Sequence, residues 1–165
     1  MNAAELRNRT CCFTGHRELP RNNIPEIEKR TADEIRRLVT NCGVRFFGVG
    51  GAIGYDTLAA EVLFRLRDQE FSNIKVILAY PFDGFTDRWT REQKEDYRKR
   101  YPQYDKVVCA CDRPSREAYL IRNRHLVDGS AYCIGYCTRN YGGTAYTFRY
   151  ARHQGVAVCN VGLKN

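Results

Sequence analysis

The sequence contains no apolar run long enough to cross a membrane. Its longest runs, such as residues 75–80, are far shorter than the roughly 20 residues of a transmembrane helix. Residues 1–9 are polar and include two arginines, and no apolar stretch of signal-peptide length follows them. We therefore expect a cytoplasmic protein with no membrane partner.

Signatures of metal binding and of disulfide frameworks are also missing. The chain has eight cysteines, but no two of them form a CxxC pair, and most lie in apolar, strand-like runs. A disulfide framework needs an oxidising compartment, which nothing in the sequence indicates. Cys109, Cys111, Cys133 and Cys137 are conceivable zinc ligands, but their CxC and CxxxC spacings match structural zinc sites poorly. We expect no metal site, and thiols that fill the core.

Two common nucleotide-binding motifs are absent as well. In residues 48–54, GVGGAIG, Ile53 stands where GxGxxG has its third glycine, and no acidic residue closes this strand to hold an adenosine ribose. This pattern argues against an ordinary NAD-dependent dehydrogenase. The chain also has no GxxxxGK[ST] sequence, which argues against a P-loop NTPase.

What the sequence does contain is the composition of a globular domain with a basic surface. Its 165 residues are 43% hydrophobic and 28% charged, and the formal net charge is +8. This length predicts a single domain over residues 1–165, with a core that needs no disulfide or metal. The positive charge favours anionic partners, either nucleotides or nucleic acid, and a merely soluble basic surface is the alternative.

Apolar, strand-like runs alternate along the chain with amphipathic, helical stretches. This pattern predicts a Rossmann-like, doubly wound α/β fold with a mostly parallel sheet of about six strands and helices on both faces. The expected strands are 10–14, 44–49, 74–80, 106–111, 131–137 and 156–161. The expected helices cover about 23–42, 55–66, 88–101, 116–127 and 142–155.

Glycine-rich turns follow three of the predicted strands. They occupy residues 14–17 (TGHR), 50–56 (GGAIGYD) and 141–147 (YGGTAYT). Glycine lets the backbone approach a ligand closely, and free amides at a helix N-terminus favour phosphate. Because ligands of open α/β sheets bind beyond the carboxyl ends of the strands, the turns predict one pocket for a phosphate-bearing, nucleotide-derived ligand. Thr14 and Thr144 would supply hydroxyl groups to it.

Four segments of the chain resemble the YpsA-like family of bacterial proteins. They read CCFTGHR, GGAIGYDTLAAEV, RNRHLVDGS and GGTAYTFRYA, and together they span nearly the whole chain in the same order. This family belongs to the SLOG superfamily, which also contains the Smf/DprA DNA-processing proteins and the cytokinin-activating LOG enzymes. The resemblance implies a Rossmann-like fold and a pocket for nucleotides or ADP-ribose-like molecules.

The resemblance also implies which residues bind the ligand. The segment GGTAYT lacks the proline, the second glycine-threonine pair and the glutamate of the LOG motif PGGxGTxxE, and this departure argues against LOG-type hydrolysis. Together with Thr14, the expected ligand-binding residues are Gly15, His16, Arg17, Gly50, Gly51, Gly54, Asp56, Arg122, Asn123, Asp128, Gly142, Gly143 and Thr144.

Three functions remain open at this point. The leading one is a sensor or regulatory protein that binds a nucleotide-like ligand, with no other cofactor. The second is an N-glycosidic hydrolase acting on nucleoside monophosphates, with Asp56, Glu61 or Asp128 as the acid. The third is binding of single-stranded nucleic acid. Asp56 could hold a ribose hydroxyl or simply complement a helix dipole. Assembly into a homo-oligomer is expected for this fold.

Overall fold

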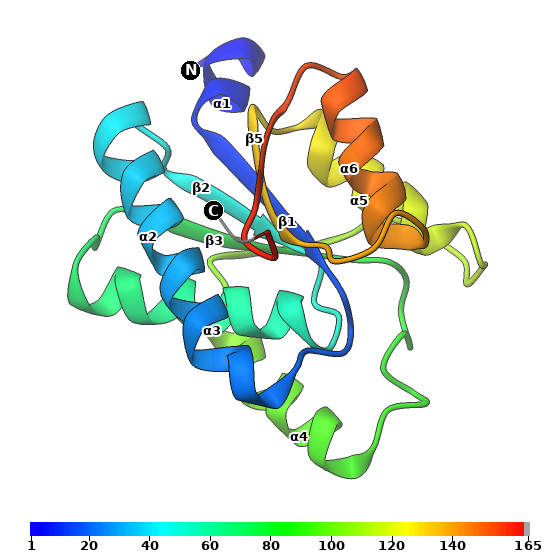
Figure 1. Ribbon diagram of the computed structural model, residues 1–165. Helices are drawn as coiled ribbons and strands as arrows, with labels where there is room; N and C mark the ends of the chain where they lie inside the picture. The colour runs from blue at the N-terminus through cyan, green and yellow to red at the C-terminus, as the bar shows by residue number, and fades with distance from the viewer. Residues whose placement is uncertain (164–165) are drawn as a thin grey trace.

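The protein is built on a six-stranded sheet in which every strand pair is parallel (Figure 1). The computed structural model describes residues 1–163. The strand order is β4-β3-β2-β1-β5-β6, so the predicted α/β class with a parallel, Rossmann-like sheet is confirmed. The strands are β1 (Thr10–Gly15), β2 (Phe46–Val49), β3 (Lys75–Tyr80), β4 (Lys106–Cys109), β5 (Tyr132–Tyr136) and β6 (Ala157–Asn160).

The helices follow their apolar periodicity and their capping residues. One helix was not predicted: α1 begins with a capping box between Asn2 and Glu5, and it has no buried residue that would give an apolar pattern. Helix α4 begins at Arg91, later than predicted, because Thr90 forms a capping box with Gln93. The helices are α1 (Ala3–Asn8), α2 (Ile24–Cys42), α3 (Tyr55–Gln69), α4 (Arg91–Arg100), α5 (Ala118–Asp128) and α6 (Gly143–His153), with 3-10 turns at η1 (Arg21–Asn23) and η2 (Tyr101–Gln103).

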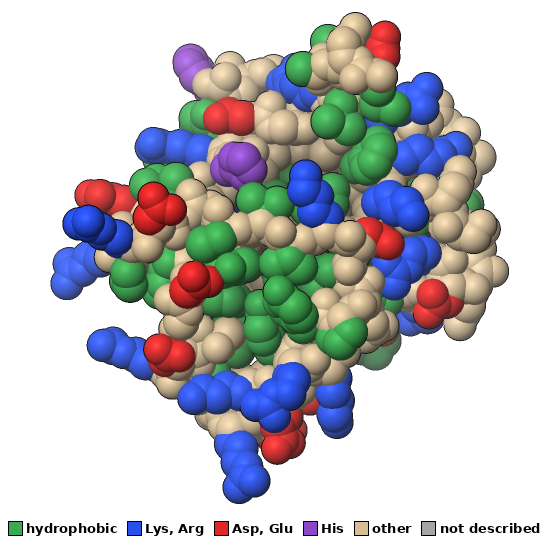
Figure 2. All heavy atoms as spheres, turned by 180° about the vertical axis from the view of Figure 1, so that it is seen from behind, with side chains coloured by type: hydrophobic (Ala, Val, Ile, Leu, Met, Phe, Trp, Pro, Cys, Tyr) green, Lys and Arg blue, Asp and Glu red, His purple; other side chains and the backbone are tan. Residues whose placement is uncertain are grey.

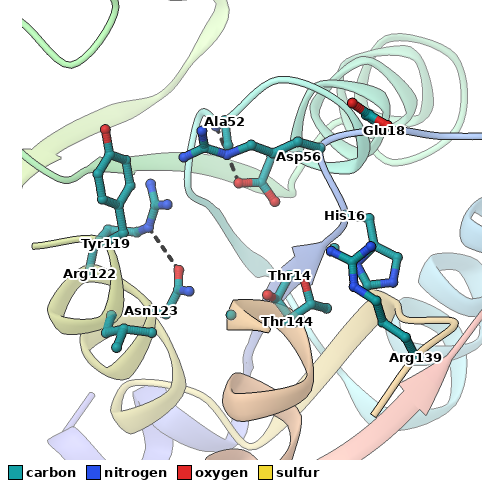
Figure 3. Close-up of a pocket in the computed structure, with 14 residues that line it drawn as sticks. Thr14, His16, Glu18, Ala52, Asp56, Tyr119, Arg122, Asn123, Arg139 and Thr144 are labelled. Carbon is teal, nitrogen blue, oxygen red and sulfur yellow. Dashed lines mark hydrogen bonds between the residues drawn. The ribbon is translucent and has the colours of Figure 1, made fainter. Parts of the chain in front are cut away.

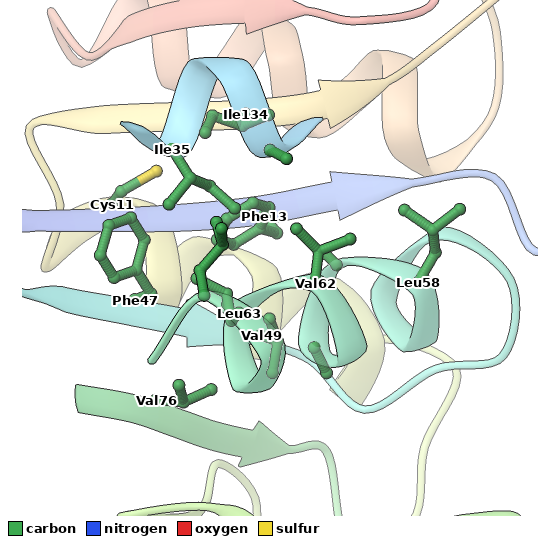
Figure 4. Packing of buried hydrophobic residues seen from close by; sticks show 14 of the residues in the cluster. Cys11, Phe13, Ile35, Phe47, Val49, Leu58, Val62, Leu63, Val76 and Ile134 are labelled. Atoms are coloured by element: carbon green, nitrogen blue, oxygen red, sulfur yellow. The ribbon is translucent and has the colours of Figure 1, made fainter. Parts of the chain in front are cut away.

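Two hydrophobic layers enclose the sheet. Helices α2 and α3 pack together on one face and α5 packs against α6 on the other (Figure 1). The larger cluster lies under α2 and α3, where Ile35 and Leu63 cover Phe47 of β2 (Figure 4). The smaller cluster includes Leu126 of α5 and Phe148 of α6. Burial on both faces explains why the strands read as continuous apolar runs rather than alternating ones.

The cysteines only partly follow the expectation that they fill the core. Cys11, Cys12, Cys133 and Cys137 are buried, but Cys109 is exposed because β4 is the edge strand of the sheet. Within residues 1–163, no helix has the length and apolar character needed to cross a membrane.

The strand order places a topological switch point beside β1. The chain adds β2, β3 and β4 outward on one side of β1, then returns to its other side to add β5 and β6. The connections that leave the carboxyl ends of β1 and β5 therefore diverge to opposite faces and leave a crevice between them. The sequence does not predict the strand order, so the position of this crevice is known only from the structure.

Candidate functional site

A cavity of about 420 Å³ opens at the switch point, between the carboxyl ends of β1 and β5 (Figure 3). It is lined by residues from the end of β1 and the β1–η1 loop, from the β2–α3 loop and the start of α3, from the first half of α5, and from the β5–α6 loop and the start of α6. Nine of the residues expected to bind the ligand line this cavity: Thr14, Gly15, His16, Arg17, Asp56, Arg122, Asn123, Gly143 and Thr144.

Four expected glycines shape the site without lining it. At Gly50, a Cβ would lie 2.7 Å from the guanidinium carbon of Arg122, so only glycine lets that side chain pass. Gly54 has φ +81°, and a Cβ there would overlap the carbonyl group of Arg17. Gly51 and Gly142 also have positive φ, of +76° and +91°, and turn the chain just before helices α3 and α6 begin.

Two expected acidic residues lie outside the cavity. Asp128 is six residues beyond Arg122, about 9 Å further along α5, and accepts a 2.6 Å hydrogen bond from the Tyr150 hydroxyl. Glu61 is five residues beyond Asp56 on α3, and its carboxylate lies 3.9 Å from the Arg100 guanidinium. Neither reaches the carboxyl ends of β1 and β5. Asp56 is therefore the only one of the three candidate acids that lines the cavity.

Asp56 is buried with one carboxylate oxygen left without a partner. It is 7% exposed, and its Oδ2 accepts a hydrogen bond from the Ala52 amide at 3.3 Å. Oδ1 has no hydrogen-bond partner among residues 1–163. Burial raises the pKa of Asp56 above its usual value, and the charge of Arg122 partly offsets that effect. Asp56 thus lines the cavity, and its buried Oδ1 is an acceptor whose capacity is unused within residues 1–163.

His16 presents the opposite hydrogen-bonding character. It is 5% exposed, and its Nε2 accepts a hydrogen bond from the Thr138 amide at 2.9 Å. A neutral imidazole that accepts at Nε2 carries its proton on Nδ1, so Nδ1 is a donor. Within the described part of the chain this donor has no partner. Burial and the nearby charge of Arg139 both lower the pKa of His16, which favours the neutral form.

Helix α6 begins at the cavity with its first turn uncapped. Gly142 precedes it, no side chain caps it, and no acidic residue stands in its first turn. The amides of Gly143 and Thr144 and the Thr144 hydroxyl are thus free to bind a ligand, and the helix dipole favours an anion there. Arg139 lies in the same loop and lines the cavity.

The far side of the cavity is formed by α5. Arg122 is buried; it donates to the Gly50 carbonyl oxygen and, from Nε, to Asn123 Oδ1 at 2.9 Å. The Tyr119 ring lies 5.2 Å from the Arg17 guanidinium carbon and 5.9 Å from that of Arg122. These contacts hold one exposed cation, Arg17, and one buried cation, Arg122, beside the same aromatic ring.

Sequence reasoning missed five residues of the cavity lining. Arg139 could have been found, because it is a cation between the end of β5 and the glycine pair that starts α6. Tyr119 gave no such signal, since its place at the rim depends on how α5 packs against the sheet. The five missed residues are Glu18, Ala52, Tyr119, Leu120 and Arg139.

The lowered pKa of His16 predicts a pH dependence of stability. Since the folded state holds the neutral imidazole, His16 stabilises the fold at pH values above its unfolded pKa, and this contribution is lost as pH falls through the lower folded pKa. We expect the Tm of the wild type to fall by about 2–4 °C more than that of His16→Gln between pH 7.5 and pH 5. Thermal melts at both pH values measure this. His153→Gln, at an exposed histidine, is the control and should follow the wild type; identical pH dependence of all three proteins would contradict the assignment.

A family model described as the YspA SLOG family (YpsA) matches residues 12–157, which include every residue lining the cavity. The chain belongs to the YpsA SLOG family. The resemblance read from the four sequence segments is thereby confirmed. A UPF0398 protein of Shouchella clausii is 27% identical over 97 residues, which are 59% of this chain and 52% of that relative.

Solved structures of two DNA processing proteins share the fold of this YpsA-family chain. DNA processing protein A of Streptococcus pneumoniae matches with a TM-score of 0.66 and 18% identity, over 93% of this chain and 50% of that one. The Helicobacter pylori protein matches with a TM-score of 0.62 and 18% identity, over 92% of this chain and 64% of that one, and is described as binding single-stranded DNA. The chain thus spans about half to two thirds of the length of these relatives.

Proposed function

We propose that this protein binds a nucleotide-derived, phosphate-bearing small molecule in the cavity between β1 and β5, as a sensor or regulatory protein. The observation that carries the proposal is the uncapped N-terminus of α6, which shares one cavity with the unpartnered Nδ1–H donor of His16. His16 and the first turn of α6 both line this cavity, and within residues 1–163 neither the uncapped amides nor Nδ1 has a partner that would compete with a ligand.

The charges around the cavity support an anionic ligand. Arg17, Arg122 and Arg139 line it together with two carboxylates, those of Glu18 and Asp56, so cations are in the majority. A phosphate group placed at α6 gains charge-assisted hydrogen bonds from backbone amides and from arginine. Such bonds are worth about twice as much as neutral ones, which makes a phosphate the favoured anchor of the ligand.

Binding without turnover is favoured over N-glycosidic hydrolysis. The glutamate of the LOG motif, seven residues after its first glycine, is absent here, because Arg149 stands at the corresponding position after Gly142. Asp56 is the only one of the three candidate acids that lines the cavity. The other carboxylate among the lining residues is that of Glu18. Release of free base from AMP or NAD during incubation would establish the hydrolase instead.

A thermal-shift panel of AMP, ADP, ADP-ribose and NAD tests the proposal. A ligand at a hundred times its dissociation constant stabilises the folded state by about 2.7 kcal/mol, which raises the Tm by about 5–10 °C for a chain of this size. We expect at least one of the four to produce such a rise. If none raises the Tm at millimolar concentration, the proposed function is wrong.

Binding of single-stranded DNA is a second candidate, favoured by the fold shared with the Helicobacter pylori protein and by the net charge of +8. Outside the cavity, Arg124 stacks on the rings of Tyr146 and Tyr150, with distances of 5.4 and 5.7 Å to the ring centroids. However, the face in Figure 2 has acidic and basic side chains interspersed around an apolar centre rather than a continuous basic track.

The salt dependence of binding separates the two candidates. Contacts to several phosphates make affinity for DNA fall steeply with salt concentration. We expect a fluorescent single-stranded oligonucleotide to show weak binding at low salt, and none at physiological salt. Tight, salt-dependent binding that free nucleotides do not displace would favour the second candidate.

A further inference from the structure

The cavity contains two buried, unpartnered groups of opposite hydrogen-bonding character. Nδ1 of His16 is a donor, and Oδ1 of Asp56 is an acceptor, on side chains that are 5% and 7% exposed. A phosphate group can satisfy the first but not the second, because an ionised phosphate oxygen offers no proton to a carboxylate. The inference that follows rests on the proposed function and concerns what else the ligand must carry.

The position of Asp56 within the cavity indicates which part of a nucleotide it meets. In Figure 3 its carboxylate lies between Arg139 and Thr144 on one side and the Tyr119 ring on the other. With the phosphate at the start of α6, the next group along a nucleotide is its sugar, and the base lies beyond it. A nucleotide bound in this way would place its sugar beside Asp56 and its base beside the Tyr119 ring.

The surroundings of Asp56 hold its free oxygen in place. Its other oxygen is fixed by the Ala52 amide at 3.3 Å. Beside it, Gly50 has so little room that an added Cβ would lie 2.8 Å from Asp56 Oδ2 and 2.7 Å from the Arg122 guanidinium. An acceptor that is buried, oriented and unsatisfied costs free energy until a donor reaches it. A sugar hydroxyl is such a donor.

We propose that Asp56 accepts a hydrogen bond from a ribose hydroxyl and makes the cavity selective for free ribonucleotides. An internal nucleotide of DNA has no 2′-hydroxyl, and its 3′-oxygen is esterified, so its sugar has no proton to donate. The same carboxylate that recognises ribose therefore excludes a DNA strand from the cavity. The strand would bring the negative charge of its phosphates close to Asp56 and would offer Oδ1 no hydrogen-bond donor in return.

Calorimetric titration with nucleotides that have or lack sugar hydroxyls tests this selectivity. The probes are AMP, GMP, CMP and UMP and the 2′,3′-dideoxy form of each. We expect the tightest-binding ribonucleotide to bind about 10- to 100-fold more tightly than its dideoxy form, the difference that one hydrogen bond to a buried charged group makes. In Asp56→Asn, whose amide can still accept but carries no charge, this ratio should fall to a few-fold.

Glu61→Gln is the matched control, because it removes a carboxylate from the same helix outside the cavity, and it should keep the full ratio. Equal affinity of the wild type for the ribose and dideoxy forms would overturn the role of Asp56 while leaving the proposed function intact. An unchanged ratio in Asp56→Asn would also overturn it. Binding of none of the four monophosphates, with ADP-ribose or NAD still raising the Tm, overturns the selectivity alone; no binding in either assay removes the proposed function as well.

Discussion

Gly54→Ala should lower the Tm by about 10 °C, a loss of roughly 3 kcal/mol of stability. Gly54 has φ +81°, where an L side chain is strained, and an added Cβ would overlap the backbone carbonyl group of Arg17. This close approach joins two parts of the site: the Tyr55 amide donates to the His16 carbonyl oxygen at 3.0 Å, next to Gly54. The substitution must therefore push the turn after β1 away from the start of α3. This displacement also increases the distance between His16 and Asp56.

Gly155→Ala is the control that separates strain from overlap. Gly155 has φ +77°, but an added Cβ would have no neighbour within 4 Å. We expect a loss of about 1 kcal/mol and a fall in Tm of about 2–4 °C from the left-handed backbone alone. Equal losses in the two variants would mean that the contact between Gly54 and Arg17 is not tight.

Gly143→Asp should abolish binding of phosphate-bearing ligands while leaving the protein as stable as the wild type, or slightly more so. An added Cβ at Gly143 has no neighbour within 4 Å, and its φ is not positive, so the site accepts a side chain. A carboxylate in the first turn of α6 interacts favourably with the helix dipole. The same carboxylate occupies the expected phosphate position and repels an anion, so we expect at least about a 100-fold loss of affinity by calorimetry.

Gly143→Asn is the matched variant, since its side chain has nearly the same shape without the charge. We expect it to lose less than about tenfold in affinity, because it partly fills the site but does not repel the ligand. Both variants should melt at or above the wild-type Tm. If the two lose affinity equally, charge at the start of α6 does not govern binding; if neither loses affinity, the phosphate lies elsewhere.

The sequence predicted where the cavity lies better than it predicted which residues line it. The three glycine turns were identified because parallel strands all present their carboxyl ends at one edge, so turns far apart in sequence must meet there. Seven of the nine expected residues that line the cavity come from these turns, whereas Arg122 and Asn123 lie on α5 and were expected only from the family resemblance. Asp128 and Glu61 do not, because a helix that starts at this edge carries later residues away from it at about 1.5 Å per residue.

Other features could not be read from one sequence. The order β4-β3-β2-β1-β5-β6, which puts the cavity beside β1, depends on which strands pair, and apolar strands of similar length do not encode that choice locally. The unpartnered atoms of His16 and Asp56 are equally hidden, since they depend on the Thr138 and Ala52 amides that occupy the other atom of each side chain.

The most direct test of phosphate binding at the switch point is a crystal structure of the protein soaked with AMP. We predict density for the phosphate group within hydrogen-bond distance of the Gly143 and Thr144 amides and of Nδ1 of His16, with a ribose hydroxyl at Asp56. AMP bound outside the cavity, for example on Arg124 and the tyrosines of α6, or a cavity that stays empty at saturating AMP while the same crystals bind it elsewhere, would contradict the site proposed for this protein.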